Sequence, residues 1–165
     1  MDHLVKIKWW FSLRKTRMEN RRLCKRYPFL IPWNRWTGDP IPEWNYEWTE
    51  WDDMPTGWRK AFGDQMLEEL REALIDDGDL YRWRIVQMKE KYGFLHLYDN
   101  GYKKGSRVPE IVSKYALLSE QTCIKCGKPA TKITTGWISP YCDDCCPKGP
   151  ADLIEEYFAE ENTDG

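Results

Sequence analysis

The clearest amphipathic pattern in the chain lies between residues 56 and 76. Apolar side chains recur there at intervals of four residues, which places them on one face of a helix. These side chains are Trp58, Phe62, Met66, Leu70 and Leu74. Pro55 suits an early position of such a helix, and Gly78 suits a cap at its carboxyl end. The pattern predicts a helix over 56–76 whose apolar face packs against a core.

An alternating pattern replaces the helical one at residue 81. Alternation over 81–88 predicts a strand. A second apolar run covers 94–98, and Gly93 between the runs supplies the permissive backbone of a turn or bulge. Residues 81–98 are therefore predicted to form an antiparallel hairpin. The first strand should place Tyr81, Trp83, Ile85 and Gln87 on one face and Arg82, Arg84, Val86 and Met88 on the other.

Three weaker patterns predict further helices. Residues 11–26 are basic with sparse apolar positions and predict a basic helix. Pro109 is placed to open a helix that continues to about Ser119. Residues 151–161 predict a short acidic helix whose inward side chains would be Leu153, Ile154, Tyr157 and Phe158.

The segment 27–55 follows neither pattern. Pro28 and Pro32 exclude a regular helix or a central strand there. We expect an extended wrapping segment whose tryptophans either cover a small core or form a stacking surface for bases or for an apolar partner. Those tryptophans are Trp33, Trp36, Trp44, Trp48 and Trp51.

These elements predict an α+β fold in four parts. Residues 1–54 form a basic and then Trp/Pro-rich segment, and 55–120 form a helix–hairpin–helix core. Residues 121–149 form a third part that contains two cysteine pairs, and 150–165 form an acidic tail. The chain of 165 residues is long enough to bury a core.

Charge is distributed unevenly along the chain although the net charge is only −2. Residues 1–30 hold nine Lys/Arg and two acids, whereas 39–53 and 151–165 each hold six acids and no base. The basic arm either binds nucleic acid or an acidic partner, or lies against acidic segments of its own chain or of a second copy. No apolar run is long enough to cross a bilayer, and the start lacks the features of a signal peptide. We therefore expect a cytoplasmic protein with no membrane contact.

Two cysteine pairs carry the strongest chemical signal. Cys123 and Cys126 form one C-x2-C pair, Cys142 and Cys145 form the other, and fifteen residues separate them. This spacing is typical of a zinc ribbon, in which two tight turns bring four thiolates to one tetrahedral ion. Iron is the minor alternative, and Cys146 could replace Cys145 as a ligand.

Four protein ligands would make the zinc structural, because no coordination position remains for a catalytic water. The chain lacks phosphate-binding glycine loops and nucleophile motifs. We interpret His96 as a partly exposed strand residue. The sequence therefore predicts a binding protein without enzymatic activity, and an enzyme of unrecognised type is the third-ranked hypothesis.

The string from Val86 to Tyr98, VQMKEKYGFLHLY, resembles a motif of small uncharacterised zinc-ribbon proteins of bacteriophages and bacteria, roughly Q-x-K-E-K-[FY]-G-x-L-x-x-Y. Three further features match in order: Gly57-Trp58 at a helix start, Ser119 before the first cysteine pair, and Gly136-Trp137 before the second. His96 and Phe94 depart from the usual Arg and Gly. The resemblance covers about 57–146 and implies a phage or prophage origin, but it implies no activity.

Two functions follow as expectations. The first is a phage-type inhibitor that counters host defence by sequestering a defence protein or a nucleotide signal. The second is nucleic-acid binding by the ribbon and the basic arm, as a small transcription or packaging factor. The charges 89–91 form either a solvated hairpin tip or an anion-recognition corner. The candidate ligand- or partner-binding residues are Arg82, Arg84, Lys89, Lys91, Tyr92, Trp33 and Trp36.

Overall fold

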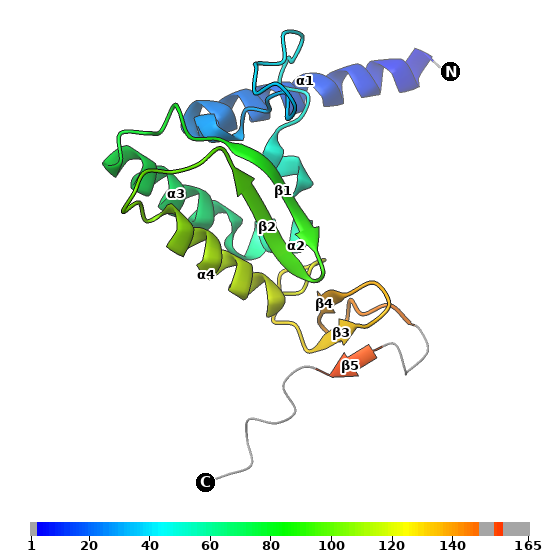
Figure 1. Cartoon of the computed structure of the whole chain (residues 1–165). Coiled ribbons are helices and arrows are strands. Elements are labelled where there is room, and N and C mark those ends of the chain that lie inside the picture. The colour runs from blue at the N-terminus through cyan, green and yellow to red at the C-terminus, as the bar shows by residue number, and fades with distance from the viewer. Residues whose placement is uncertain (1–2, 149–153, 157–165) are drawn as a thin grey trace.

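The computed structural model describes residues 3–148 and 154–156, and it has the α+β fold that the sequence predicts. A hairpin lies at the centre, helices pack on one side of it, and a small three-stranded sheet lies beyond its tip (Figure 1). The elements in chain order are α1 (His3–Arg26), η1 (Pro28–Leu30), η2 (Glu50–Asp53), α2 (Thr56–Trp58), η3 (Arg59–Gly63), α3 (Asp64–Asp76), β1 (Ile85–Lys91), β2 (Phe94–Asp99), α4 (Val108–Glu120), β3 (Lys132–Thr134), β4 (Ser139–Tyr141) and β5 (Ile154–Glu156).

The predicted helix over 56–76 is present as α2, a π turn (η3) and α3 in direct succession. Its predicted apolar face is buried in the core. Gly78 caps its end with a positive φ of 66°, and the backbone N–H groups of Gly78 and Asp79 return to the carbonyls of Ile75 and Leu74. This pairing satisfies carbonyls that the end of the helix leaves without partners, and it confirms the predicted cap.

The hairpin begins later than predicted and contains a bulge. Backbone N–H groups of Arg82 and Trp83 both bind the Asp79 carbonyl, which holds the chain in a turn until β1 starts at Ile85. The register then shifts between Ile85 and Gln87. The predicted alternation is wrong beyond this point, because the extra residue of a bulge reverses the faces that follow it. Met88 is fully buried as a result, with Trp83 and Ile85.

A two-residue turn closes the hairpin at Tyr92 and Gly93. Both residues have positive φ, 54° and 83°, as a tight turn between right-twisted strands requires. The charged residues 89–91 belong to β1 and are not the tip. Glu90 accepts a hydrogen bond of 2.7 Å from the Gly93 backbone N–H and so fastens the turn.

Helix α4 packs on the inner face of β2, and Ser119 joins the two elements. The fully buried Ser119 hydroxyl accepts a 2.8 Å hydrogen bond from the Leu95 backbone N–H and donates one to the Ala116 carbonyl at 2.6 Å. The Ser119 hydroxyl therefore links the end of α4 to β2.

Ser119→Ala should destabilise the protein by about 1–3 kcal/mol, because the buried N–H of Leu95 loses its acceptor. Ser113→Ala is the matched control, since Ser113 is exposed on the same helix and should change stability by less than about 0.5 kcal/mol. Urea unfolding measures both values. Equal stability of the two variants would contradict this role of Ser119.

The N-terminal segment packs on its own chain. The predicted basic helix is present within α1, whose N-terminal part extends past the rest of the molecule (Figure 1). Arg17 pairs with Glu47, and Arg26 pairs with Glu68 at 2.6 Å. These two contacts match the interpretation in which the basic arm meets acids of its own chain.

The tryptophans of 27–55 serve different purposes. Trp44 and Trp51 are partly buried against the core, and Trp51 lies so close to Gly63 that a side chain there would collide with its ring. Trp36, in contrast, is 97% exposed at a loop. The core-covering interpretation is thus confirmed for Trp44 and Trp51.

Strands β3 and β4 pair antiparallel, and β5 pairs antiparallel with the other side of β3. The predicted acidic helix is therefore wrong for residues 154–156, which form β5 because β3 offers them an open edge. The rest of that prediction, 151–153 and 157–161, lies outside the described residues. Of the helices within the described ranges, none combines the length and the apolar character that crossing a membrane requires.

Candidate metal centre and adjoining recess

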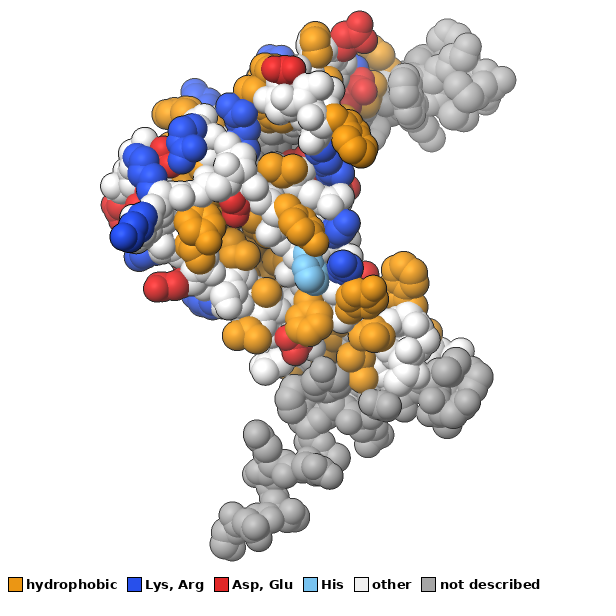
Figure 2. Space-filling model, in the orientation of Figure 1, with side chains coloured by type: hydrophobic (Ala, Val, Ile, Leu, Met, Phe, Trp, Pro, Cys, Tyr) orange, Lys and Arg blue, Asp and Glu red, His pale blue; other side chains and the backbone are white. Residues whose placement is uncertain are grey.

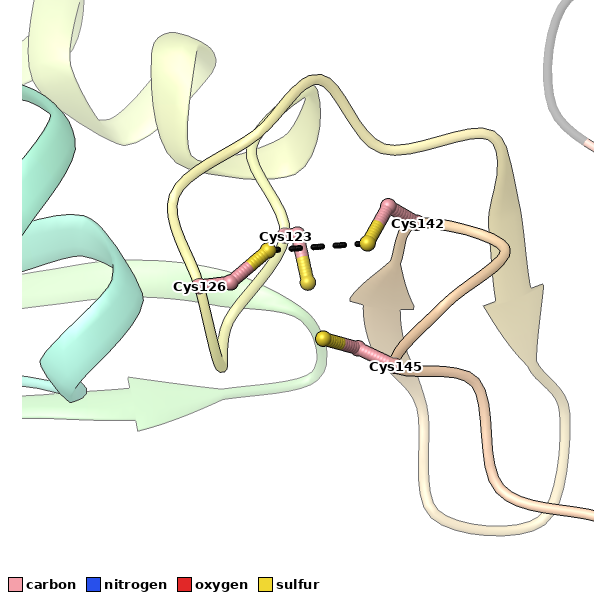
Figure 3. Close-up of side chains that lie close together, drawn as sticks. All are labelled: Cys123, Cys126, Cys142 and Cys145. Carbon is pink, nitrogen blue, oxygen red and sulfur yellow. Dashed lines mark hydrogen bonds between the residues drawn. The ribbon is translucent and has the colours of Figure 1, made fainter.

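Four cysteines converge between the two sheets and α2. The sulfur atoms of Cys123, Cys126, Cys142 and Cys145 all lie within 4.8 Å of one another, and all four cysteines are free of disulfides (Figure 3). The Sγ atoms of Cys126 and Cys142 are 3.5 Å apart. Four sulfurs at about 2.3 Å from one tetrahedral ion are separated by about 3.8 Å, so the cluster can hold a metal ion.

Tight turns place both pairs. The Gly127 N–H binds the Cys123 carbonyl at 3.0 Å in the first turn, and the N–H groups of Cys145 and Cys146 bind the Cys142 carbonyl at 3.1 and 3.0 Å in the second. This second turn directs Cys145 into the cluster. Cys146 lies outside the group of four, as the two-residue spacing predicts.

The thiols differ in how readily they ionise. Burial opposes ionisation of Cys123, but hydrogen bonds from backbone groups of Cys142, Cys126 and Lys125 outweigh it and lower the Cys123 pKa to about 7. The hydrogen bond with Cys126, together with burial, raises the Cys145 pKa to about 12. Crowded thiolates repel one another, and a bound cation removes that penalty.

The first cysteine turn docks directly on the start of α2. The Gly57 N–H donates to the Ile124 carbonyl at 2.9 Å, and the buried Trp58 indole N–H donates to the Thr122 carbonyl at 2.9 Å. A Cβ on Gly57 would lie 2.6 Å from the carbonyl of Ile124 and closer still to that of Cys123. Gly57 and Trp58 therefore couple the cysteine cluster to the core.

The hairpin tip meets the ribbon beside this centre, and a recess of about 460 Å³ lies between them. Residues 89–92 line it from the hairpin, and residues 136–138 line it from the loop between β3 and β4. A Cβ on Gly93 would touch Ile138 at 3.3 Å, which shows how closely the turn approaches this loop. Trp137 is 79% exposed at its rim.

The structure brings together three of the predicted binding residues. Lys89, Lys91 and Tyr92 line the recess, and the Lys91 ammonium lies 5.3 Å from the centre of the Tyr92 ring. An aromatic surface beside two cations suits a flat ligand that carries negative charge. Glu90 also lines this recess, where its carboxylate is already bonded to the Gly93 N–H.

The other four predicted residues lie away from the recess. Arg82 donates to Asp79 at 2.9 Å, and its hydrogen bond holds the pKa of the Asp79 carboxyl below its usual range. The Arg84 guanidinium covers the Trp33 ring at 3.1 Å, and burial lowers its pKa. Strand β1, roughly 20 Å long, separates Arg84 from Tyr92. Trp36 lies on the loop that follows Trp33.

Sequence reasoning missed the contribution of the ribbon to this recess. The Gly136-Trp137 pattern does not by itself indicate a binding site, because Trp137 reaches the hairpin tip only through a contact between residues far apart in the sequence. His96 is half-buried, as predicted, between the rings of Phe94 and Tyr98 on the same face of β2. The alternation of Phe94, His96 and Tyr98 in the sequence is the signal that could have placed these three rings on one face.

Comparisons with known proteins find no matching family model, no similar curated protein and no similar solved structure. The resemblance to phage and bacterial proteins stays a prediction.

Proposed function

We propose that the chain is a zinc-ribbon binding protein without enzymatic activity, and that its ligand is a nucleotide held in the recess. The observation that carries this proposal is the convergence of Trp137, Tyr92, Lys89 and Lys91 on one recess of about 460 Å³. Aromatic faces stack on nucleobases, and lysines bind phosphate. The volume falls within the range of small-molecule sites.

Zinc is the metal that the four thiolates suit best. A tetrahedral sulfur set is typical of zinc or of iron, and a ribbon of two C-x2-C pairs favours zinc. With four protein ligands the ion would be structural. Its task would be to hold the first cysteine turn against α2 and, through β4, to hold residues 136–138 beside the hairpin tip.

The alternative, nucleic-acid binding by the ribbon and the basic arm, has less support. Lys128 is paired with Asp144 at 2.8 Å, and Lys132 is paired with Asp143 at 3.2 Å. Arg17 and Arg26 in the basic arm are also paired, with Glu47 and Glu68. These acidic partners compete with phosphate for four of the cations that this alternative would use.

The counter-defence role is one use of a nucleotide-binding recess in the host cytoplasm. It rests on the resemblance to phage proteins and stays a prediction, as does sequestration of a host defence protein. Phage infection of defended bacterial cells tests it. Wild-type protein should restore infection, and Trp137→Ala should not.

Calorimetric titration of the zinc-loaded chain with ribo- and deoxyribonucleoside monophosphates tests the proposed function. We expect binding that Trp137→Ala weakens at least fivefold, because a stacked ring contributes about 1–3 kcal/mol. Tyr81→Ala is the matched control, since Tyr81 is 80% exposed and Trp137 is 79% exposed, and Tyr81 lies near the opposite end of β1. Unaltered affinity of Trp137→Ala, or no nucleotide binding by the zinc-loaded protein, would contradict the proposal.

A further inference from the structure

A row of rings leads away from the recess along the outer face of β2. Phe94, His96 and Tyr98 alternate in sequence, so their side chains share one face of the hairpin. The residues opposite them in β1 are Lys91, Lys89 and Gln87, which places two lysines on the same face. Helix α4 packs against β2 from the other side. Figure 2 shows hydrophobic, histidine and basic side chains gathered over the hairpin and toward the ribbon.

The spacing of these rings suits bases that are separated from one another. The ring centres of Phe94 and His96 are 6.2 Å apart, and so are those of His96 and Tyr98. Neighbouring bases in a duplex strand are spaced by about 3.4 Å. A strand that follows the row must therefore have its bases splayed apart, which single strands permit and duplexes do not.

Charge on this face favours a phosphate backbone. The Lys89 ammonium lies 5.8 Å from the centre of the Tyr98 ring, and Lys91 lies beside Tyr92 at the start of the row. Glu90 accepts a hydrogen bond from the Gly93 N–H and Asp99 accepts one from the Gly101 N–H, each at 2.7 Å, so both carboxylates keep their charge but are held against backbone donors. Two cations thus lie beside a row of three aromatic side chains, in which the rings of His96 and Tyr98 are inclined by only 20° and Phe94 is edge-on to His96 at 80°.

We infer that the natural ligand is a single-stranded nucleic acid about four nucleotides long at the contact, with one nucleotide in the recess and its neighbours on Phe94, His96 and Tyr98. The inference rests on the proposed function, because it assigns a longer ligand to the same site. Stacking on rings and backbone contacts to lysines read no particular sequence, so binding should tolerate base changes.

A length series tests the inference. Affinity of the zinc-loaded full chain for oligothymidylates and oligouridylates of one to eight nucleotides should rise steeply up to about four and then level off. With two lysines at the phosphates, the logarithm of the binding constant should fall with the logarithm of salt concentration at a slope of about −1.4. A duplex of the same length should bind at least tenfold more weakly than the single strand. Tighter binding of the duplex would overturn the inference.

Tyr98→Leu separates the inference from the proposed function, because Tyr98 lies on the row but does not line the recess. It should weaken binding of the eight-nucleotide strand at least fivefold more than it weakens mononucleotide binding, a comparison that allows for the lost contact between Tyr98 and Lys89. Tyr98→Phe should restore binding, and Tyr81→Leu should match wild type. Zinc content and circular dichroism establish that each variant is folded.

Each outcome points to one conclusion. Affinity that does not depend on length, with Tyr98→Leu equal to wild type, would overturn the inference and leave the recess as a site for a free nucleotide. Absence of binding to both strands and mononucleotides would overturn the inference and the proposed function together.

Discussion

Cys142→Ser is expected to release the metal and to unfold the ribbon around the cysteine cluster. Removing one of four thiolates breaks the tetrahedral set, and metal binding is the main source of folding free energy in such small modules, about 10–16 kcal/mol in zinc-finger peptides. The short strands β3 and β4, three residues each, cannot supply that energy themselves. Metal analysis should find one zinc per wild-type chain and none after Cys142→Ser.

Cys146→Ser is the matched control for this loss. Cys146 lies next to Cys145 but outside the cluster, so its replacement should leave one zinc per chain and an unchanged amide NMR spectrum. Cys142→Ser should instead collapse the amide signals of residues 121–146 toward random-coil positions. Retention of a tightly bound metal by Cys142→Ser, or its loss from Cys146→Ser, would contradict the assignment of the ligands.

Gly57→Ala is expected to destabilise the protein by about 2–3 kcal/mol or more. Alanine normally stabilises a helical position relative to glycine by about 0.5–1 kcal/mol. Here, however, the added Cβ would lie 2.6 Å from the backbone carbonyl of Ile124, which has no flexible end that can move away. The sign of the effect therefore reports whether the first cysteine turn docks on α2. Thermal and urea unfolding of the zinc-loaded protein measure it.

Gly136→Ala provides the comparison for Gly57→Ala. A Cβ on Gly136 would have no heavy atom within 4 Å, so we expect a change within about 0.5 kcal/mol. If Gly57→Ala instead matched or exceeded wild-type stability, the helix and the cysteine turn would not be in contact, and the metal centre would be a separate module.

Local patterns predicted most of the secondary structure because each signal lies within a few residues. Signals of this kind are the four-residue repeat over 58–74, the glycine cap at Gly78 and the spacing of the cysteine pairs. The bulge after Ile85 was not, because the sequence on either side continues to alternate, and only packing against the core decides which residue is extra. Met88 therefore lies on the same buried face as Trp83 and Ile85, whereas simple alternation places it on the opposite face.

The candidate site was predicted only in part for a related reason. The lysines of β1 and Tyr92 form one continuous stretch of sequence, so they were found together. Trp137 lies more than forty residues further along the chain and reaches the recess only in the folded structure. Arg82 and Arg84 lie outside the recess, because Arg82 pairs with Asp79 and Arg84 packs on the Trp33 ring. Proximity in the sequence therefore predicts the hairpin side of the recess, and tertiary contacts determine the side formed by residues 136–138.

We propose that the hairpin tip and a ribbon held together by its metal ion jointly bind one nucleotide unit. Fluorine NMR of protein labelled with 5-fluorotryptophan tests it most directly, with the Trp137 signal identified by its absence from Trp137→Phe. We expect nucleotide to shift this signal in the zinc-loaded protein, to leave the Trp36 signal in place, and to have no effect on Trp137 after zinc is removed by a chelator. A Trp137 signal that does not respond to nucleotide, or that responds equally without zinc, would contradict the account.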